Sequence, residues 1–114
     1  MTEDHAFPIE IDCQAVQRLR REAADFLLLD CREPAEFERV RIEGTTLIPM
    51  SELGRRAAEL LEHQQRRIVV YCHLGGRSLR VAQWLREQGY AQAQSMAGGI
   101  DAWAKSVDPD LPTY

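Results

Sequence analysis

Short apolar runs alternate along the chain with segments in which apolar residues recur every three or four positions. Continuous apolar runs of about five residues are typical of buried strands, whereas the longer period indicates amphipathic helices. The pattern predicts strands over residues 7–11, 26–30, 45–49, 67–71 and 94–97. It predicts helices over residues 13–24, 32–39, 51–63, 78–88 and 100–105. Asp12 and Ser51 are expected to cap helix starts, and Gly89 a helix end.

The alternation of strands and helices predicts an α/β fold, in which a parallel sheet carries helices on both faces. Ligands of such sheets bind beyond the carboxyl ends of the strands. Three groups fall at such ends: Asp30 with Arg32, Cys72 with the loop after it, and the pair Gly98 and Gly99. These groups are therefore the first candidates for a functional site.

Length and charge narrow the class of protein. The chain has 114 residues, which suit one domain over 1–114 with an irregular tail over about 108–114. Its 14 basic and 18 acidic residues give a net charge of −4, which argues against a general nucleic-acid binder. No apolar run approaches the roughly 20 residues of a membrane helix, and the N-terminus does not read as a signal peptide. We expect a soluble cytoplasmic protein with no membrane or nucleic-acid partner.

The three cysteines, Cys13, Cys31 and Cys72, form no CxxC pair, and their odd number predicts free thiols in a reducing compartment. Cys13 is expected to be inert at a helix start. Cys31 is expected to pack in the core, although its position at a strand end leaves open a role as resolving partner of Cys72. The histidines show no metal-ligand spacing with each other or with the cysteines, so no metal site is predicted. No organic cofactor is expected either.

The segment YCHLGGRS, residues 71–78, places Cys72 between a predicted strand and a predicted helix. Gly75 and Gly76 allow the backbone to curl, so that successive N–H groups point inward and form an anion-binding nest. The helix start and Arg77 add positive charge. A lone cysteine at a strand end is usually a small buried apolar residue, but this combination favours a nucleophilic thiolate. The loop therefore predicts attack on an oxyanion substrate through a covalent intermediate.

Four segments of the chain occur in the order found in one known family. They are LLLDCREPAEFE at 27–38, RIEGTTLIPMSEL at 41–53, IVVYCHLGGRS at 68–78 and GYAQAQSMAGGIDAW at 89–103. Together they resemble the single-domain rhodanese (sulfurtransferase) family over nearly the full length. The resemblance implies a rhodanese-like, five-stranded parallel sheet with flanking helices. It also implies that Cys72 takes up a sulfane sulfur as a persulfide and passes it to a nucleophilic acceptor, with thiosulfate and cyanide as the family's usual test substrates.

The resemblance places the donor and persulfide in the loop after Cys72. The residues implied to form this cradle are His73, Leu74, Gly75, Gly76, Arg77 and Ser78. Asp30 and Arg32 are implied to support the mouth of the site. A plainer interpretation is an Asp–Arg pair that fixes loop geometry without touching substrate. The expected partners are a small sulfur-donor anion or a protein persulfide, together with a thiol or protein acceptor.

Two other functions remain open for this sequence. Phosphatases of the rhodanese fold resemble it but carry one more loop residue, so the six-residue CHLGGR favours sulfur over phosphate and disfavours a phosphatase or arsenate-reductase-like enzyme. A non-catalytic binding or regulatory module is the second alternative, but such modules often lose the cysteine that this chain retains. The second loop position, often cationic where thiosulfate activity is good, is His73 here. This histidine suggests that a protein or glutathione persulfide is the physiological donor.

Several further residues have structural interpretations. Glu36 is expected to be a helix-surface or structural residue rather than a catalytic acid. Trp84 and Trp103 are expected to anchor packing. The tail through Tyr114 is free to cross the surface, and the sequence leaves open whether it covers the pocket.

Overall fold

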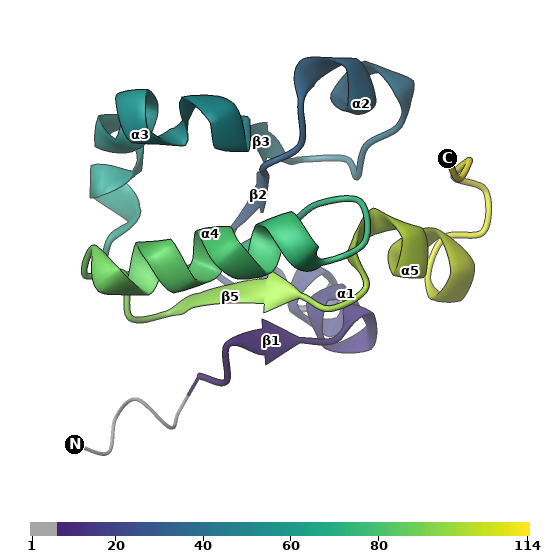
Figure 1. Ribbon diagram of the computed structural model, residues 1–114. Coiled ribbons are helices and arrows are strands. Elements are labelled where there is room, and N and C mark those ends of the chain that lie inside the picture. The colour runs from purple at the N-terminus through teal and green to yellow at the C-terminus, as the bar shows by residue number, and fades with distance from the viewer. Residues whose placement is uncertain (1–6) are drawn as a thin grey trace.

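The computed structural model describes residues 7–114, in which five strands form one sheet (Figure 1). The strands are β1 (Glu10–Ile11), β2 (Phe26–Asp30), β3 (Thr46–Leu47), β4 (Arg67–Tyr71) and β5 (Ala93–Met96). The α-helices are α1 (Cys13–Arg21), α2 (Pro34–Arg39), α3 (Leu53–Arg56), α4 (Gly76–Glu87) and α5 (Gly99–Ser106). The 3-10 helices η2 (Met50–Glu52) and η3 (Ala57–His63) flank α3. None of the helices within residues 7–114 is long and apolar enough to cross a membrane.

The strand order is β1-β5-β4-β2-β3, and all neighbouring strands are parallel. This arrangement confirms the predicted α/β class. β4 is central, and β2 pairs with it from Phe26 opposite Arg67 to Asp30 opposite Tyr71. The sequences FLLLD and RIVVY of these strands are almost continuously apolar because helices cover both sides of the sheet. Since the strands are parallel, the residues that follow β2, β4 and β5 meet at one edge.

Helices cover both faces of the sheet, as predicted (Figure 1). On one face, α3, η3 and α4 contribute buried side chains that include Leu53, Leu60 and Leu85. On the other face, α1 and α5 contribute Val16 and Trp103. Leu85 is fully buried, and burial of one such side chain stabilises the fold by roughly 1.5–3 kcal/mol. The two cores hold the central strands, and hence the loop after β4, in place.

Most predicted element ends are close to those observed. The side chain of Asp12 accepts a hydrogen bond from the Ala15 N–H at 2.8 Å, which confirms it as the cap of α1. The C-cap of α4 is Gln88, and Gly89 follows it with a left-handed φ of +101°. The predicted cap was therefore off by one residue: Gly89 lies one position beyond the observed cap, where glycine relieves the steric cost of a left-handed conformation.

The prediction of one continuous helix from Ser51 to about His63 was wrong. The segment divides into η2, α3 and η3, and Ser51 does not cap a helix. Its hydroxyl instead donates to Glu33 of the neighbouring α2 region at 3.0 Å. The segment still buries Leu53 and Leu60, so packing against the sheet, rather than continuous helical hydrogen bonding, sets its path.

Candidate active site

The loop between β4 and α4 folds around the sulfur of Cys72. Gly75 has a left-handed φ of +111°, which reverses the chain directly before α4 and favours glycine there. The N–H groups of Gly75 and Ser78 then point at Cys72 Sγ, at 3.1 and 3.3 Å. Such N–H groups stabilise a thiolate and any negative charge on a sulfur attached to it. Cys72 itself exposes only 1% of its surface.

The carbonyl groups of the same loop point the opposite way, towards α5. The N–H groups of Ile100 and Asp101 donate to the carbonyl oxygens of Cys72 and His73, at 2.9 and 3.1 Å. Gly99 makes this approach possible, because a Cβ there would lie 2.5 Å from the Cys72 carbonyl oxygen. The predicted glycine pair thus provides both a turn, with φ of +82° at Gly98, and the room for close contact.

Ser78 fixes the inner side of the loop. Its hydroxyl lies 3.4 Å from Cys72 Sγ and donates to the Gly75 carbonyl at 3.2 Å. It also contacts the hydroxyl of Ser95, on β5, at 2.8 Å. Ser78 and Ser95 are both fully buried. The sequence indicated Ser78 but not Ser95, because nothing in a short strand such as AQSM shows that one hydroxyl faces the loop around Cys72.

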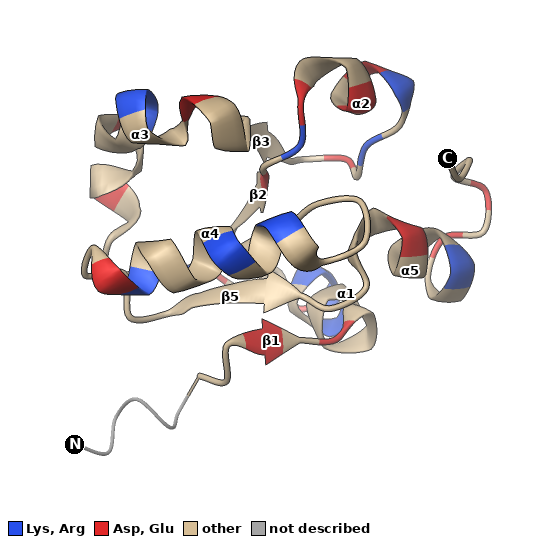
Figure 2. Cartoon of the chain, viewed as in Figure 1, with Lys and Arg blue, Asp and Glu red and all other residues tan. Residues whose placement is uncertain are grey.

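Arg77 is paired with a carboxylate rather than left as an open anion site. Its two terminal nitrogens donate to Glu36 of α2 at 2.8 and 2.9 Å. Figure 2 shows the acidic positions on α2 and the basic positions on α4. The hydrogen bonds from Arg77 lower the pKa of Glu36 to about 2. The positive charge that Arg77 was predicted to add to the loop after Cys72 is therefore largely balanced by the Glu36 carboxylate. Glu36 has the structural role that was expected of it.

Asp30 and Arg32 form a buried pair beside the loop, at the end of β2. Arg32 donates from Nε and Nη2 to the Asp30 carboxylate at 3.0 and 2.7 Å, and both side chains are fully buried. Arg32 Nη2 also donates to the Val40 carbonyl at 2.6 Å. Burial opposes the charge of Arg32, but the hydrogen bonds to Asp30 and Tyr114 outweigh it and raise the Arg32 pKa. These contacts favour the plainer interpretation, in which the pair fixes the backbone near the site.

The tail reaches the site through Tyr114. Its hydroxyl accepts from Arg32 at 3.0 Å and donates to Glu36 at 2.7 Å. Its ring stacks on the ring of His73, with centroids 3.9 Å apart and an interplanar angle of 10°. The Tyr114 backbone oxygen lies 2.8 Å from His73 Nε2. Residues 107–114 form no helix or strand, but Tyr114 contacts the active-site loop, which the sequence did not predict.

The remaining loop positions face outward or enter the helix. Leu74 is 62% exposed, which is unusual for a large apolar side chain. Gly76 is the first residue of α4, two positions before the predicted start. Leu74 is therefore the loop side chain most available to a partner.

The other cysteines are buried thiols. Cys13 and Cys31 are free and buried on opposite faces of the sheet. Burial raises the pKa of Cys13 to about 11 and raises that of Cys31 further, with the neighbouring charge of Cys72 adding to the effect. Within residues 7–114 no group of three His, Cys, Asp or Glu side chains is arranged to hold a metal ion. The interpretation of His5 as a non-ligand lies outside the described residues.

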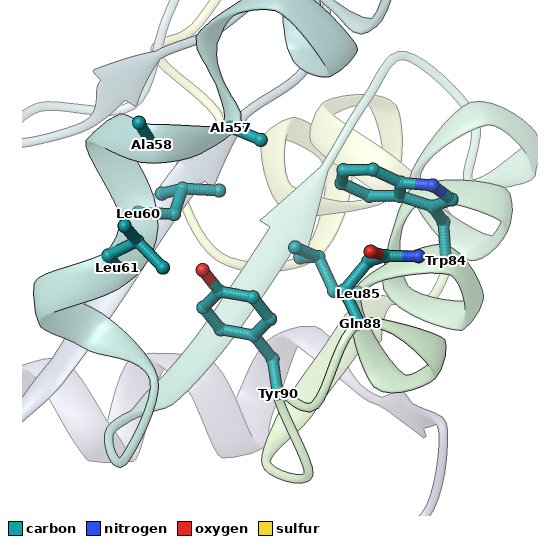
Figure 3. Close-up of a pocket in the computed structure, with 8 residues that line it drawn as sticks. All are labelled: Ala57, Ala58, Leu60, Leu61, Trp84, Leu85, Gln88 and Tyr90. Atoms are coloured by element: carbon teal, nitrogen blue, oxygen red, sulfur yellow. The ribbon is translucent and has the colours of Figure 1, made fainter.

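A separate apolar pocket of about 230 Å³ lies between η3 and α4 (Figure 3). Leu60 and Leu61 line it from η3, and Trp84 and Leu85 line it from α4, with Tyr90 between them. None of the residues that line it belongs to the loop around Cys72. The pocket therefore lies apart from the chemistry of that loop. Both tryptophans pack as the sequence predicted: Trp103 is buried in one core, and Trp84 is partly buried and packs against the other.

Comparisons with known proteins agree with this architecture. The family model "Rhodanese-like domain" matches residues 13–106. The chain is 34% identical over 96 residues to a sulfurtransferase of Allochromatium vinosum, covering 84% of this chain and 88% of that protein. It is 37% identical over 109 residues to the adenylyltransferase and sulfurtransferase MOCS3-2 of Zea mays, covering 91% and 23% of the two chains. The solved thiosulfate sulfurtransferase from Pseudomonas aeruginosa has a TM-score of 0.79 at 26% identity, covering 97% of this chain and 21% of that one.

These matches assign the chain to a family, but most of the curated relatives are much longer than the chain. The chain spans 30% and 23% of the first curated plant relatives, so the activities of those longer proteins do not transfer to it directly. The family match itself contains the whole loop of residues 72–78 and all of the sheet except β1. The chain belongs to the rhodanese-like domain family.

Proposed function

We propose that this chain is a sulfurtransferase in which Cys72 carries a sulfane sulfur, as a persulfide, from a donor to a thiophilic acceptor. The proposal rests on the N–H groups of Gly75 and Ser78, which point at Cys72 Sγ at 3.1 and 3.3 Å. These groups would stabilise the thiolate before attack and the charged persulfide after it. The relatives from Allochromatium vinosum and Pseudomonas aeruginosa are both named sulfurtransferases, which supports the same reaction class.

In this proposal the nucleophile is the thiolate of Cys72, and its attack forms a covalent intermediate. The Cys72 thiolate attacks the outer sulfur of the donor, a new S–S bond forms, and the rest of the donor leaves as sulfite or a thiolate. An acceptor thiolate or cyanide then attacks the outer sulfur of the persulfide, and the Cys72 thiolate is regenerated. The six-residue loop from Cys72 to Arg77 favours a single terminal sulfur over a tetrahedral phosphate.

The charges around the loop favour a persulfide over thiosulfate as the donor. Thiosulfate is a dianion and gains most from an unpaired cation near the sulfur. Arg77 is instead bound to Glu36, and His73 is stacked on Tyr114. We expect kcat/KM to be about tenfold higher with glutathione persulfide than with thiosulfate, a modest difference of about 1.4 kcal/mol in transition-state stabilisation. Steady-state kinetics that show the reverse order would overturn this choice of donor.

Intact-mass spectrometry tests the sulfur-carrier function directly. The reduced wild-type chain, treated with thiosulfate or glutathione persulfide, should gain one sulfur, about 32 Da. Cys72→Ser should gain none, whereas Cys13→Ser, which changes a cysteine in the other core, should load like the wild type. Absence of the gain in the wild type, or its persistence in Cys72→Ser, would refute the proposal. Hydrolysis of an aryl phosphate by the wild type would instead favour a phosphatase.

A further inference from the structure

Cys31 lies beside Cys72 at the ends of two paired strands. The register of β2 with β4 ends with Asp30 opposite Tyr71, and each cysteine follows by one residue. The Cys31 N–H donates to the Tyr71 carbonyl at 3.1 Å, which continues the parallel pairing by one step. Neighbouring strands lie about 4.8 Å apart, within the range of Cα separations that a disulfide can bridge.

The two side chains also lie on the same face of the sheet. Side chains alternate along a strand, so the cysteines face away from the side that Tyr71 occupies. Cys31 and Cys72 belong to the same buried core, together with Leu29 and Val70, which lie two positions before them. Cys31 is fully buried and Cys72 almost so. The third cysteine, Cys13, belongs to the opposite core.

We propose that Cys31 is a resolving residue, which attacks Sγ of the Cys72 persulfide and releases its outer sulfur as hydrosulfide. This inference rests on the proposed persulfide and adds a second activity to it, namely sulfide release with formation of a Cys31–Cys72 disulfide. The bond from Cys72 Sγ to the outer sulfur breaks as the bond between the cysteines forms. The Cys31 S–H proton passes to the departing sulfur.

The step is balanced without an external oxidant. The sulfane sulfur is reduced to sulfide, and the two cysteine sulfurs are oxidised to the disulfide. A dithiol or glutathione then returns both cysteines to the reduced state. Before loading, burial raises the pKa of Cys31 and keeps it a thiol, so it does not compete with Cys72 for the donor. The reaction therefore empties a loaded site that meets no acceptor, and it leaves Cys72 in a disulfide that thiols can reduce.

Anaerobic mass spectrometry of the full chain after removal of the donor tests this inference. The wild type, loaded with glutathione persulfide, should first gain about 32 Da and then convert to a species about 2 Da lighter than the reduced chain, with one sulfide released. Cys31→Ala should keep the added sulfur about tenfold longer, while the matched control Cys13→Ala should behave like the wild type. The conversion should be independent of protein concentration, and peptide mapping should find a Cys31–Cys72 crosslink.

The outcomes separate this inference from the proposed function. If the wild type keeps the added sulfur as long as Cys31→Ala does, the resolving role is refuted and the sulfur-carrier function stands. If no variant that retains Cys72 gains sulfur, both fail. Should Cys31→Ala unfold, Cys31→Val provides a larger apolar replacement. The peptide map of the wild type needs no variant, and absence of the Cys31–Cys72 peptide after sulfide release would overturn the inference on its own.

Discussion

The ion pair between Glu36 and Arg77 joins α2 to the loop around Cys72, and we predict that Glu36→Gln destabilises the protein in a pH-dependent way. The contacts of 2.8 and 2.9 Å with Arg77 lower the Glu36 pKa from its ordinary value of 4.5 to about 2. Such a shift corresponds to roughly 3 kcal/mol. The two side chains are 21% and 33% exposed, and solvent screening reduces the effect. We therefore expect a loss of about 1–2 kcal/mol at pH 7.

The sign of the pH dependence follows from the direction of that shift. A carboxylate whose pKa is lower in the folded than in the unfolded chain stabilises the fold at pH values above the unfolded-state pKa. The contribution of Glu36 is therefore complete above about pH 5 and is lost as the pH falls towards about 2. At about pH 3, roughly half of it should remain. The stability difference between the wild type and Glu36→Gln should shrink accordingly.

Urea denaturation at several pH values between about 3 and 7 measures this difference. Glu59→Gln is the matched control, because Glu59 of η3 is 53% exposed where it pairs with Arg56 of α3, and exposed pairs contribute little. The control should leave the unfolding free energy unchanged across the same range. The reasoning would be refuted if Glu36→Gln had the same unfolding free energy as the wild type at pH 7, or if its loss of unfolding free energy grew towards pH 3.

Two further substitutions test the backbone and the buried pair. Gly99→Ala would place a Cβ 2.5 Å from the Cys72 carbonyl oxygen at a φ of +63°, and we expect urea unfolding to show a loss of about 2–4 kcal/mol. Gly54→Ala meets nothing within 4 Å and should be neutral or slightly stabilising, so an equal loss in both variants would contradict the steric argument. Arg32→Lys replaces the guanidinium, which donates from two nitrogens to Asp30, by a single ammonium group. We expect the free energy of unfolding to fall by about 2–4 kcal/mol in the same assay. A variant as stable as the wild type would show that these buried hydrogen bonds are dispensable.

The sequence best predicted the features that depend on residues close to one another in the chain. The bounds of β2 and β4 agree with their apolar runs, because a strand buried on both faces leaves an unbroken apolar signal. The nest around Cys72 was also predictable, since Gly75, the cysteine and the start of α4 lie within a few residues of one another. Within such short stretches, backbone geometry restricts what the chain can do.

What the sequence could not predict are contacts between residues far apart in the chain. Arg77 and Glu36 are 41 positions apart, as are His73 and Tyr114. Each residue alone carries no signal for its partner, because many arrangements of the same helices would bring other charges together. Arg77 was consequently predicted as an anion site, and only the tertiary structure shows that a carboxylate occupies it. Ser95 was missed for the same reason.

The orientation of the loop depends on α5 as much as on the loop itself. In a planar trans peptide, the carbonyl and the next N–H point in opposite directions. Because Ile100 and Asp101 of α5 hold the carbonyls of Cys72 and His73, the N–H groups of His73 and Leu74 must point away from α5. Helix α5, which comes late in the sequence, thus fixes the orientation of the first two peptide groups of the loop through backbone atoms alone. Because these contacts involve backbone atoms only, and the side chain of Leu74 is exposed, substitution of Leu74 should leave the orientation of these peptide groups unchanged.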